Sequence, residues 1–430
     1  MDNTLSLAAL WPPPEGFIPV PSLLDGIELY APAPVEEEEE TRTFKCRYCG
    51  GTIAYSAAEQ ELTCPYCGRT QDITAEEVGE AAAEFEFTLE TMERAQYGWG
   101  EERRELVCES CGAVVSVAPD VLTSTCAFCG SNRVLARDVA GDVLRPTALI
   151  PFVVDKGQIQ SQVAEWLGRG WMHPPELRNV RALRELTGVY LPFWTFDARV
   201  HADWKAEVGT RKSVRYFDDG KWKTRTVIVW HWRSGRVHLP IDDHLTSGTA
   251  HVSRVILGKV APFDLDALVE YEPGYLAGWQ AKAYDVQLQD AWQLAKEEIR
   301  EQARRACHAD TGSAHVRNFR MAADFADERW RYVLLPVYLA SYPFEERTFQ
   351  VMVNGQTGTV AGQKPVAWER VWLAIAAMLA PGACLGLLGL LTLALGGIGI
   401  VGLVLGFVLL VAGLIGAVVV FKKARASEEV

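Results

Sequence analysis

Eight of the ten cysteines in the chain occur as four Cys-x-x-Cys pairs, which fall into two modules. Fourteen residues separate the inner cysteines of each module, and a glycine follows every pair. Two intervening residues let both thiolates of a pair reach one ion, and the glycine relieves the turn that follows. The spacing predicts two closed four-thiolate sites, which Zn²⁺ favours. We therefore expect two structural zinc ions, with these ligands: Cys46, Cys49, Cys64 and Cys67; Cys108, Cys111, Cys126 and Cys129.

Other chemistry of paired cysteines fits these modules less well. A thioredoxin-type redox pair needs a strand before it and a helix after it, which neither module offers. Catalytic zinc needs an open coordination position, and four thiolates leave none. A secreted disulfide scaffold would need a signal peptide, but residues 1–10 have no basic region and three prolines follow at 12–14. Metal-bound thiolates in a cytosolic setting fit the pattern better.

Catalytic motifs are absent from the rest of the sequence. It contains no G-x-x-x-x-G-K-[ST] loop, no His-Glu-x-x-His and no G-x-S-x-G. Asp242, Asp243 and His244 form the most suggestive cluster, because paired carboxylates beside a histidine can bind metal or move protons. Chance proximity in a loop is the simpler interpretation of this cluster. His231 is interpreted as a strand residue and Cys307 as a buried thiol. We predict a protein that is not an enzyme and has no small-molecule substrate.

The charge of the chain bears on nucleic-acid binding. The net charge is −13, and residues 35–145 hold 22 Asp and Glu against 10 Lys and Arg. Unspecific electrostatic binding of a polyanion to this acidic region is disfavoured. A small specific site is still compatible with the sequence, and six arginines are its candidate phosphate contacts: Arg47, Arg69, Arg103, Arg104, Arg133 and Arg137.

The cysteine modules belong to a longer series of segments. Residues 52–55 and 113–116 read as short strands inside the modules, which makes each module a small β zinc ribbon. The region from 74 to 94 is rich in Ala and Glu and predicts an exposed helix. The expected order is a disordered Pro- and Glu-rich lead (1–43), zinc ribbon 1 (44–73), an acidic helical linker (74–105), zinc ribbon 2 (106–141), an α+β domain (142–365), a transmembrane hairpin (366–423) and a tail (424–430).

The α+β domain shows both helix and strand patterns. Apolar residues at helical spacing predict helices over 158–167 and 289–308. Turn residues predict two hairpins, one around Asp218-Asp219-Gly220 and one around Asn354-Gly355. The segments 190–194 and 334–338 resemble each other, with 149–152 as a third copy. Since proline removes a backbone donor, these proline-marked strand openings are interpreted as edge strands, with convergence as the alternative.

The last part of the chain predicts two membrane spans. Fifty-one residues between Arg370 and Lys422 carry no charged side chain, whereas one helix needs about 20 residues to cross a bilayer. We place the spans at 371–393 and 400–421, with a glycine-rich reversal between them and a kink at Pro381. Basic residues flank both outer ends and none lies in the turn, which predicts a multi-pass protein of the inner membrane with both termini cytoplasmic. Gly382-x-x-x-Gly386 and Gly402-x-x-x-Gly406 are candidate packing motifs.

The chain resembles a bacterial family of zinc-ribbon membrane proteins, whose members carry a TFIIB-type ribbon, a soluble domain and C-terminal membrane helices. The matching stretches are the cysteine modules and the segments 189–194, 275–279, 335–338 and 353–358. Such proteins are often labelled primosomal or replication-factor-like, but this chain has no helicase ATP motif. The resemblance implies partners of the SPFH and phage-shock type in membrane maintenance.

Two hypotheses follow from these patterns. In the first, the protein is a non-enzymatic, membrane-anchored adaptor that recruits or organises proteins at the cytoplasmic face of the membrane. In the second, it is a nucleic-acid-binding protein tethered to the membrane. The fold class that we expect is multidomain, with two small β zinc ribbons, an α+β domain and a C-terminal two-helix hairpin. A third idea, a hydrolase using Asp242, Asp243 and His244, rests on that cluster alone.

Overall fold

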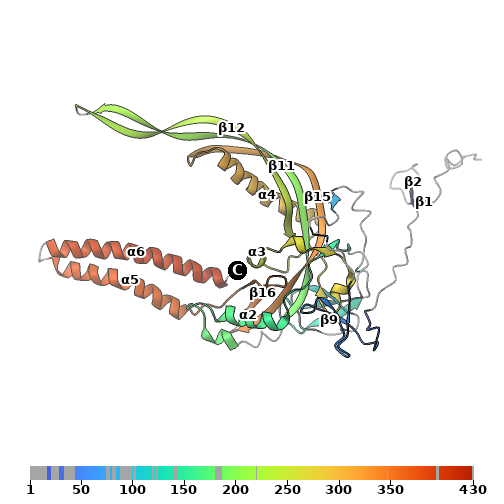
Figure 1. The fold of residues 1–430 in the computed structure, drawn as a ribbon. Coiled ribbons are helices and arrows are strands. Elements are labelled where there is room, and N and C mark those ends of the chain that lie inside the picture. Colours follow the sequence, from blue (N-terminus) through green and yellow to red (C-terminus); the bar gives the residue numbers. More distant parts are fainter. Residues whose placement is uncertain are drawn as a thin grey trace, which may run out of the picture. The chain divides into compact units, whose positions relative to one another are not determined.

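Two very long strands dominate the fold, β11 (Thr187–Asp218) and β12 (Lys221–Ser247). They pair antiparallel from Phe193↔Ser247 out to Asp218↔Lys221 and form the green ribbon of Figure 1. The turn predicted around Gly220 therefore joins strands several times longer than the sequence indicated. The structure is a computed structural model that describes residues 17–20, 29–32, 44–73, 78–79, 84–87, 99, 103–118, 121, 124–138, 144–179, 186–218, 220–345, 347–393 and 397–428.

The chain divides into two compact units, Met1–Arg42 and Thr43–Val430. In the first unit, β1 (Phe17–Val20) and β2 (Leu29–Pro32) pair antiparallel. These strands differ from the disordered lead that we expected over 1–43. Apolar residues in both segments favour strands, and a two-stranded pair tolerates proline because its outer edges need no donor. The other residues of the lead lie outside the described part of the chain.

The second unit is built on a large mixed sheet. Its path runs β13-β10-β15-β11-β14-β8-β7-β9, with β12 added to β11, β16 and β6 to β15, and β17 to β16. The strand bounds are β6 (Phe85–Glu86), β7 (Arg104–Cys108), β8 (Val114–Val117), β9 (Val134–Asp138), β10 (Ala148–Leu149), β13 (Val269–Glu270), β14 (Gln280–Ala281), β15 (Val316–Phe344), β16 (Arg347–Asn354) and β17 (Val360–Gly362).

The repeated proline-marked segments are not edge strands, so that interpretation was wrong. They are the central strands β11 and β15, which pair antiparallel with each other at Tyr190↔Pro336 and Pro192↔Leu334. The carbonyl of Pro192 accepts from Gly248 N–H, and the carbonyl of Pro336 accepts from Gly355 N–H. Each proline therefore directs its donor-less nitrogen away from the β11–β15 ladder, where no ladder hydrogen bond is lost.

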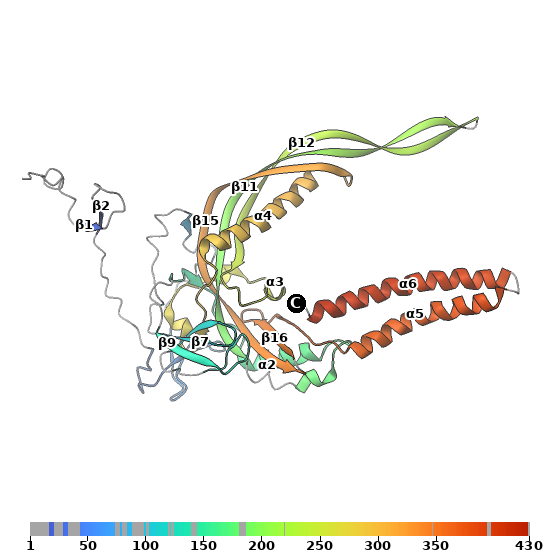
Figure 2. The ribbon, with the colours of Figure 1, turned by 180° about the vertical axis from the view of Figure 1, so that it is seen from behind.

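Both helices predicted in this body are confirmed. Helix α2 (Lys156–Gly168) is capped by Asp155 and buries Ile159, Val163 and Leu167. Helix α4 (Leu288–Asp310) buries one apolar face and packs on β11, β12 and β15, as Figures 1 and 2 show from opposite sides. Shorter helical turns complete the body: η3 (Pro175–Asn179), α3 (Arg254–Val260), η5 (Leu265–Ala267) and η6 (Pro273–Leu276).

The predicted acidic linker is not one helix. Within it, Phe85–Glu86 form β6 and pair with Trp330 and Arg329 of β15. The ring of Phe85 lies 5.0 Å from that of Trp330, so burial of an aromatic side chain on the sheet outweighs the helix propensity of the neighbouring Ala and Glu. Most of residues 74–102 lie outside the described part.

Two apolar helices end the chain, α5 (Trp368–Leu391) and α6 (Gly397–Glu428). Both are long and apolar enough to cross a membrane, and Pro381 lies inside α5 as predicted. The helices lie side by side in both ribbon views (Figures 1 and 2). A Cβ added to Gly406 would lie 2.5 Å from the nitrogen of Gly386, so the predicted glycine motifs do pack the helices together.

Candidate metal centres

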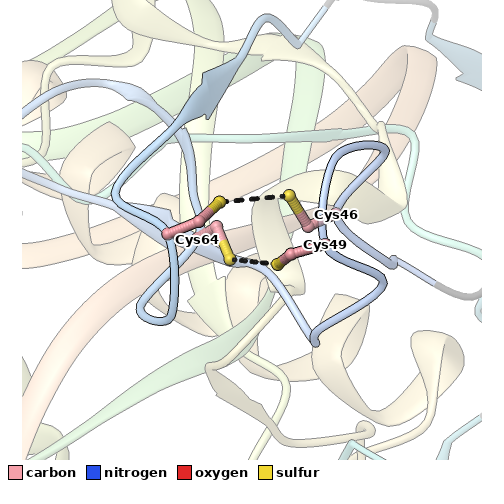
Figure 3. Close-up of side chains that lie close together, drawn as sticks. Cys46, Cys49 and Cys64 are labelled. Atoms are coloured by element: carbon pink, nitrogen blue, oxygen red, sulfur yellow. Dashed lines mark hydrogen bonds between the residues drawn. The ribbon is translucent and has the colours of Figure 1, made fainter.

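The first cysteine module brings its four thiols together; we call this group cluster 1. Its knuckles flank a small sheet of β3 (Ala54–Ser56), β4 (Glu61–Thr63) and β5 (Thr70–Gln71). Cys46 Sγ lies 3.6 Å from Cys67 Sγ, and Cys49 Sγ lies 3.5 Å from Cys64 Sγ (Figure 3). All four sulfur atoms lie within 4.8 Å of one another, so they can hold one metal ion between them.

The second module forms cluster 2 with nearly the same geometry. Cys108 Sγ lies 3.6 Å from Cys129 Sγ, and Cys111 Sγ lies 3.7 Å from Cys126 Sγ. A disulfide would bring two sulfur atoms to about 2.05 Å, and all eight thiols are free. Two groups of four thiols at this spacing could each hold one metal ion.

The glycine after each Cys-x-x-Cys pair has the conformation that the sequence predicts. Gly50, Gly68, Gly112 and Gly130 have φ between 68° and 75°, the left-handed region that side chains disfavour. Each of these glycines donates its N–H to the carbonyl of the first cysteine of its pair, at 2.8 or 2.9 Å. The four Cys-x-x-Cys segments therefore have the same type of backbone turn, and each turn directs its two thiols toward a common point.

Backbone amides make the first thiol of each module easier to ionise. The N–H groups of Tyr48 and then Cys49 lower the pKa of Cys46 to about 6. Burial raises the pKa of Cys108, but the N–H groups of Cys111 and Ser110 outweigh it and lower the pKa to about 7. At Cys49 the N–H of Gly51 lowers the pKa, yet the bond to Cys64 and burial raise it to about 12. Adjacent thiols cannot all ionise alone, so complete ionisation requires a bound cation.

Cluster 2 is part of the large sheet. Ser116 of β8 pairs with Ala281 of β14, which in turn pairs with β11. The carbonyl of Phe128, between two of the cysteines, accepts hydrogen bonds of 2.7 Å from Ser341 Oγ and from Gln350 Nε2. The second cysteine module is thus joined to the body through strands and through its knuckle.

Cluster 1 docks on the body by different contacts. The N–H of Tyr55 donates to the carbonyl of Ala277 at 2.9 Å, and the indole of Trp279 donates to the carbonyl of Tyr55 at 2.9 Å. The ring of Tyr55 is buried and packs edge-on against Tyr275, 5.1 Å between ring centres. The small sheet β3–β4–β5 is separate from the large one, so cluster 1 rests on the body through side chains and single hydrogen bonds.

Matching positions of the two modules differ sharply in exposure. Phe128 precedes the last cysteine of cluster 2 and is only 4% exposed. Tyr66 holds the same position in cluster 1 and is 76% exposed, and Tyr48 on the facing knuckle is 62% exposed. The guanidinium of Arg69 lies over the Tyr48 ring, 4.1 Å from its centre. Cluster 1 therefore presents an uncovered aromatic face, here called the tyrosine face (Tyr48 and Tyr66), whereas cluster 2 has its equivalent packed inside.

Several arginines considered for phosphate contact are engaged within the protein. Arg103 is buried and donates to Ser116 Oγ at 2.8 Å and to the carbonyl of Trp279 at 2.8 Å. Arg133 pairs with Glu109 at 3.0 Å and Arg137 with Glu105 at 2.6 Å. Of the other three candidates, Arg47 and Arg69 are exposed and Arg104 is half-buried.

The Asp242, Asp243 and His244 trio does not converge on one point. Asp243 contacts the guanidinium of Arg331, whereas His244 Nε2 lies 3.3 Å from Glu298 on α4 without forming a hydrogen bond. Asp242 is exposed. His231 pairs with Val208 in β12, and Cys307 is buried in α4, so both are the structural residues that we predicted.

A buried ionic cluster surrounds Asp243, and sequence reasoning missed most of it. Arg331 is buried and reaches Glu84 Oε1 at 3.6 Å as well as Asp243. Asp197 accepts from the Asp243 N–H, and burial followed by the nearby Glu84 raises the pKa of Asp197 to about 7. The available signal was a charged residue next to a run of apolar ones, Asp197 after residues 188–196 and Arg331 before residues 332–340.

The chain is similar over most of its length to a bacterial protein. A protein of Bacillus subtilis (strain 168), described as "Uncharacterized protein YdjG", is 28% identical to it over 336 residues, which span 76% of this chain and 92% of that protein. No protein-family model matches the chain. No solved structure matches it either.

Proposed function

We propose that this protein is a non-enzymatic, membrane-anchored adaptor with two zinc ribbons, which captures partner proteins through the tyrosine face of cluster 1. The single observation that carries the proposal is the contrast between exposed Tyr66 and buried Phe128. The two cysteine modules have the same spacing and turns, but only in cluster 2 is the aromatic residue before the last cysteine covered. Exposed aromatic side chains on a rigid, metal-held turn are typical anchors of protein–protein interfaces.

Zinc is the ion that best suits both clusters. Four thiolates around a tetrahedral ion at about 2.3 Å place the sulfur atoms about 3.8 Å apart. The closest sulfur pairs are separated by 3.5–3.7 Å, close to that value. With Zn²⁺ bound, the four cysteines of each cluster would fill the coordination sphere, so the ion would hold the fold and take no substrate.

The charges around α5 and α6 support an orientation with both ends in the cytoplasm. Lys364 precedes α5 and Arg370 lies in its first turn, and Lys422, Lys423 and Arg425 lie near the end of α6. The turn between the helices carries no charged residue. Positive residues stay on the cytoplasmic side, so the metal clusters would face the reducing cytoplasm of the inner membrane. SPFH-domain and phage-shock-type proteins are the partners that the family resemblance implies.

A crosslinking pull-down with matched variants tests this proposal. Tyr48→Ser with Tyr66→Ser should leave two zinc ions per chain and membrane insertion intact, but lose most captured protein. Leu135→Ser is the matched control, since Leu135 is 59% exposed on β9 beside cluster 2 and should change nothing. Proteins are identified by mass spectrometry and zinc is measured in the same eluate. Unchanged capture by the tyrosine variant would refute the tyrosine face as the recruiting surface.

The nucleic-acid hypothesis is tested in the same eluate. If nuclease-sensitive nucleic acid were the main cargo, and its capture fell steeply with salt, the adaptor function would be wrong. The buried position of Arg103 and the ion pairs of Arg133 and Arg137 count against phosphate contacts at cluster 2.

A further inference from the structure

The outer part of the β11–β12 hairpin extends beyond β15, and only its base is contacted by Ser313, His315 and Arg317 among the residues that the structure describes. The pairing of β15 with β11 ends at Val208↔Val316, whereas β11 and β12 continue to pair as far as Asp218↔Lys221. We call residues 209–218 and 220–230 the arm. It is a two-stranded ribbon about 30 Å long, given about 3.3 Å per residue, and it extends past the ends of α4 and β15 in both views (Figures 1 and 2).

The tip of the arm is aromatic. Phe217 pairs with Trp222 across the strands, with ring centres 5.4 Å apart. These rings are 61% and 67% exposed, and Ile228 farther along the arm is 40% exposed. A two-stranded ribbon is marginally stable in water, and exposed aromatic clusters mark surfaces that meet another phase or molecule. The arm therefore has the character of a contact surface.

The shaft of the arm is basic, in contrast to the chain as a whole. Residues 210–225 carry six basic side chains against two acidic ones, while the whole chain has a net charge of −13. The basic residues are exposed and occur on both strands: Arg211, Lys212, Arg215, Lys221, Lys223 and Arg225. Lys221 and Lys223 flank Trp222 directly. Tryptophan between lysines is the arrangement found where a protein enters the headgroup region of a bilayer.

We propose that the arm lies on an anionic phospholipid surface, with Phe217 and Trp222 at the boundary between headgroups and acyl chains and the basic residues on the lipid phosphates. This inference rests on the membrane anchoring in the proposed function. Tethering by α5 and α6 raises the local concentration of lipid at the arm, which offsets the repulsion between the acidic chain and an anionic surface. A nucleic acid in solution gains no such advantage, so lipid is the favoured occupant.

Hydrogen–deuterium exchange of the full chain in nanodiscs tests the inference. Amides of the arm should exchange at least about fivefold more slowly in discs with one third phosphatidylglycerol than in pure phosphatidylcholine discs. Raising the salt concentration should weaken this protection, because charged contacts at a surface are screened. The triple variant Lys221→Glu, Lys223→Glu, Arg225→Glu should abolish it, and Phe217→Ser with Trp222→Ser should reduce it.

The control variant carries the same change of charge at exposed positions elsewhere, Lys156→Glu, Arg254→Glu and Lys259→Glu, and should keep the protection of the arm. Equal exchange of the arm in both kinds of disc would overturn the inference. Protection that requires added duplex DNA, or two chains per disc, would also overturn it in favour of those occupants. Failure of the anchor is distinguishable, because α5 and α6 themselves would then exchange rapidly in every disc.

Discussion

The carboxylate of Asp197 accepts a hydrogen bond of 2.7 Å from the backbone N–H of Asp243, at a place where β11 slips in register against both of its neighbours. Asp243 has φ of 49°, so the bulge on β12 is held in a conformation that few side chains adopt. Arg331 of β15 contacts Asp243 from the third strand. One buried polar cluster therefore joins β11, β12 and β15 below the arm.

Stability should depend on pH through Asp197. Burial and then Glu84 raise its pKa to about 7, above the value of about 4 in an unfolded chain. The folded state therefore binds this proton more tightly, and the stabilisation is present below about pH 4 and is lost as the pH rises through 7. Asp197→Asn keeps an oxygen acceptor for the Asp243 N–H without the charge.

We expect Asp197→Asn to melt with the wild type at pH 4 and about 2–4 °C above it at pH 8, measured by thermal unfolding in detergent. Because the charge of Asp242 contributes to the raised pKa of Asp197, Asp242→Asn should reduce the dependence of stability on pH. A flat difference between Asp197→Asn and wild type from pH 5 to 8 would show that this carboxyl does not titrate there.

Loss of metal should have unequal effects at the two clusters. Cys108→Ser with Cys111→Ser removes the ion from a module that shares strands with the large sheet, and we expect the body to melt about 10 °C lower. Cys46→Ser with Cys49→Ser acts on a module with its own small sheet, so exchange should increase mainly over residues 44–73. Elemental analysis should find one ion per chain in each variant and two in the wild type. Equal melting of both variants would contradict this difference.

The matching knuckle residues offer a second comparison. Phe128→Ala empties a buried site and should cost about 3–5 kcal/mol of unfolding free energy. Tyr66→Ala removes an exposed ring and should stay within about 0.5 kcal/mol of wild type. Urea unfolding in detergent measures both. Equal costs would mean that the ring of Tyr66 is covered in the folded protein.

The helix hairpin depends on one close glycine contact. A Cβ on Gly406 would lie 2.5 Å from the backbone of α5, whereas a Cβ on Gly386 would meet nothing within 4 Å. Gly406→Ala should therefore cost about 1–3 kcal/mol of helix pairing, and Gly386→Ala should cost almost none. Exchange of the α5 and α6 amides in nanodiscs measures the difference. Similar exchange in both variants would show that the helices do not pack at this point.

Local features of this chain were predictable and its long-range pairing was not. Cysteine spacing predicted both clusters because the ligands are neighbours in sequence. Apolar periodicity predicted α2 and α4, and the long stretch without charge predicted the two terminal helices. Pro192 was assigned to an edge strand because proline has no backbone N–H to donate. Whether the proline nitrogen faces a neighbouring strand depends on pairing with a segment far along the chain. Arg103 was taken for a surface residue because its carbonyl acceptors at 276 and 279 cannot be seen in sequence.

The order of the strands also sets when this protein can finish folding on the ribosome. Cysteine modules need only nearby residues and can take up metal soon after they are made. The large sheet must wait, because β11 and β10 both need β15, which ends at Phe344. The first apolar helix begins shortly afterwards, at Trp368. Completion of the body and delivery of the helices to the bilayer therefore fall in the same short interval of translation.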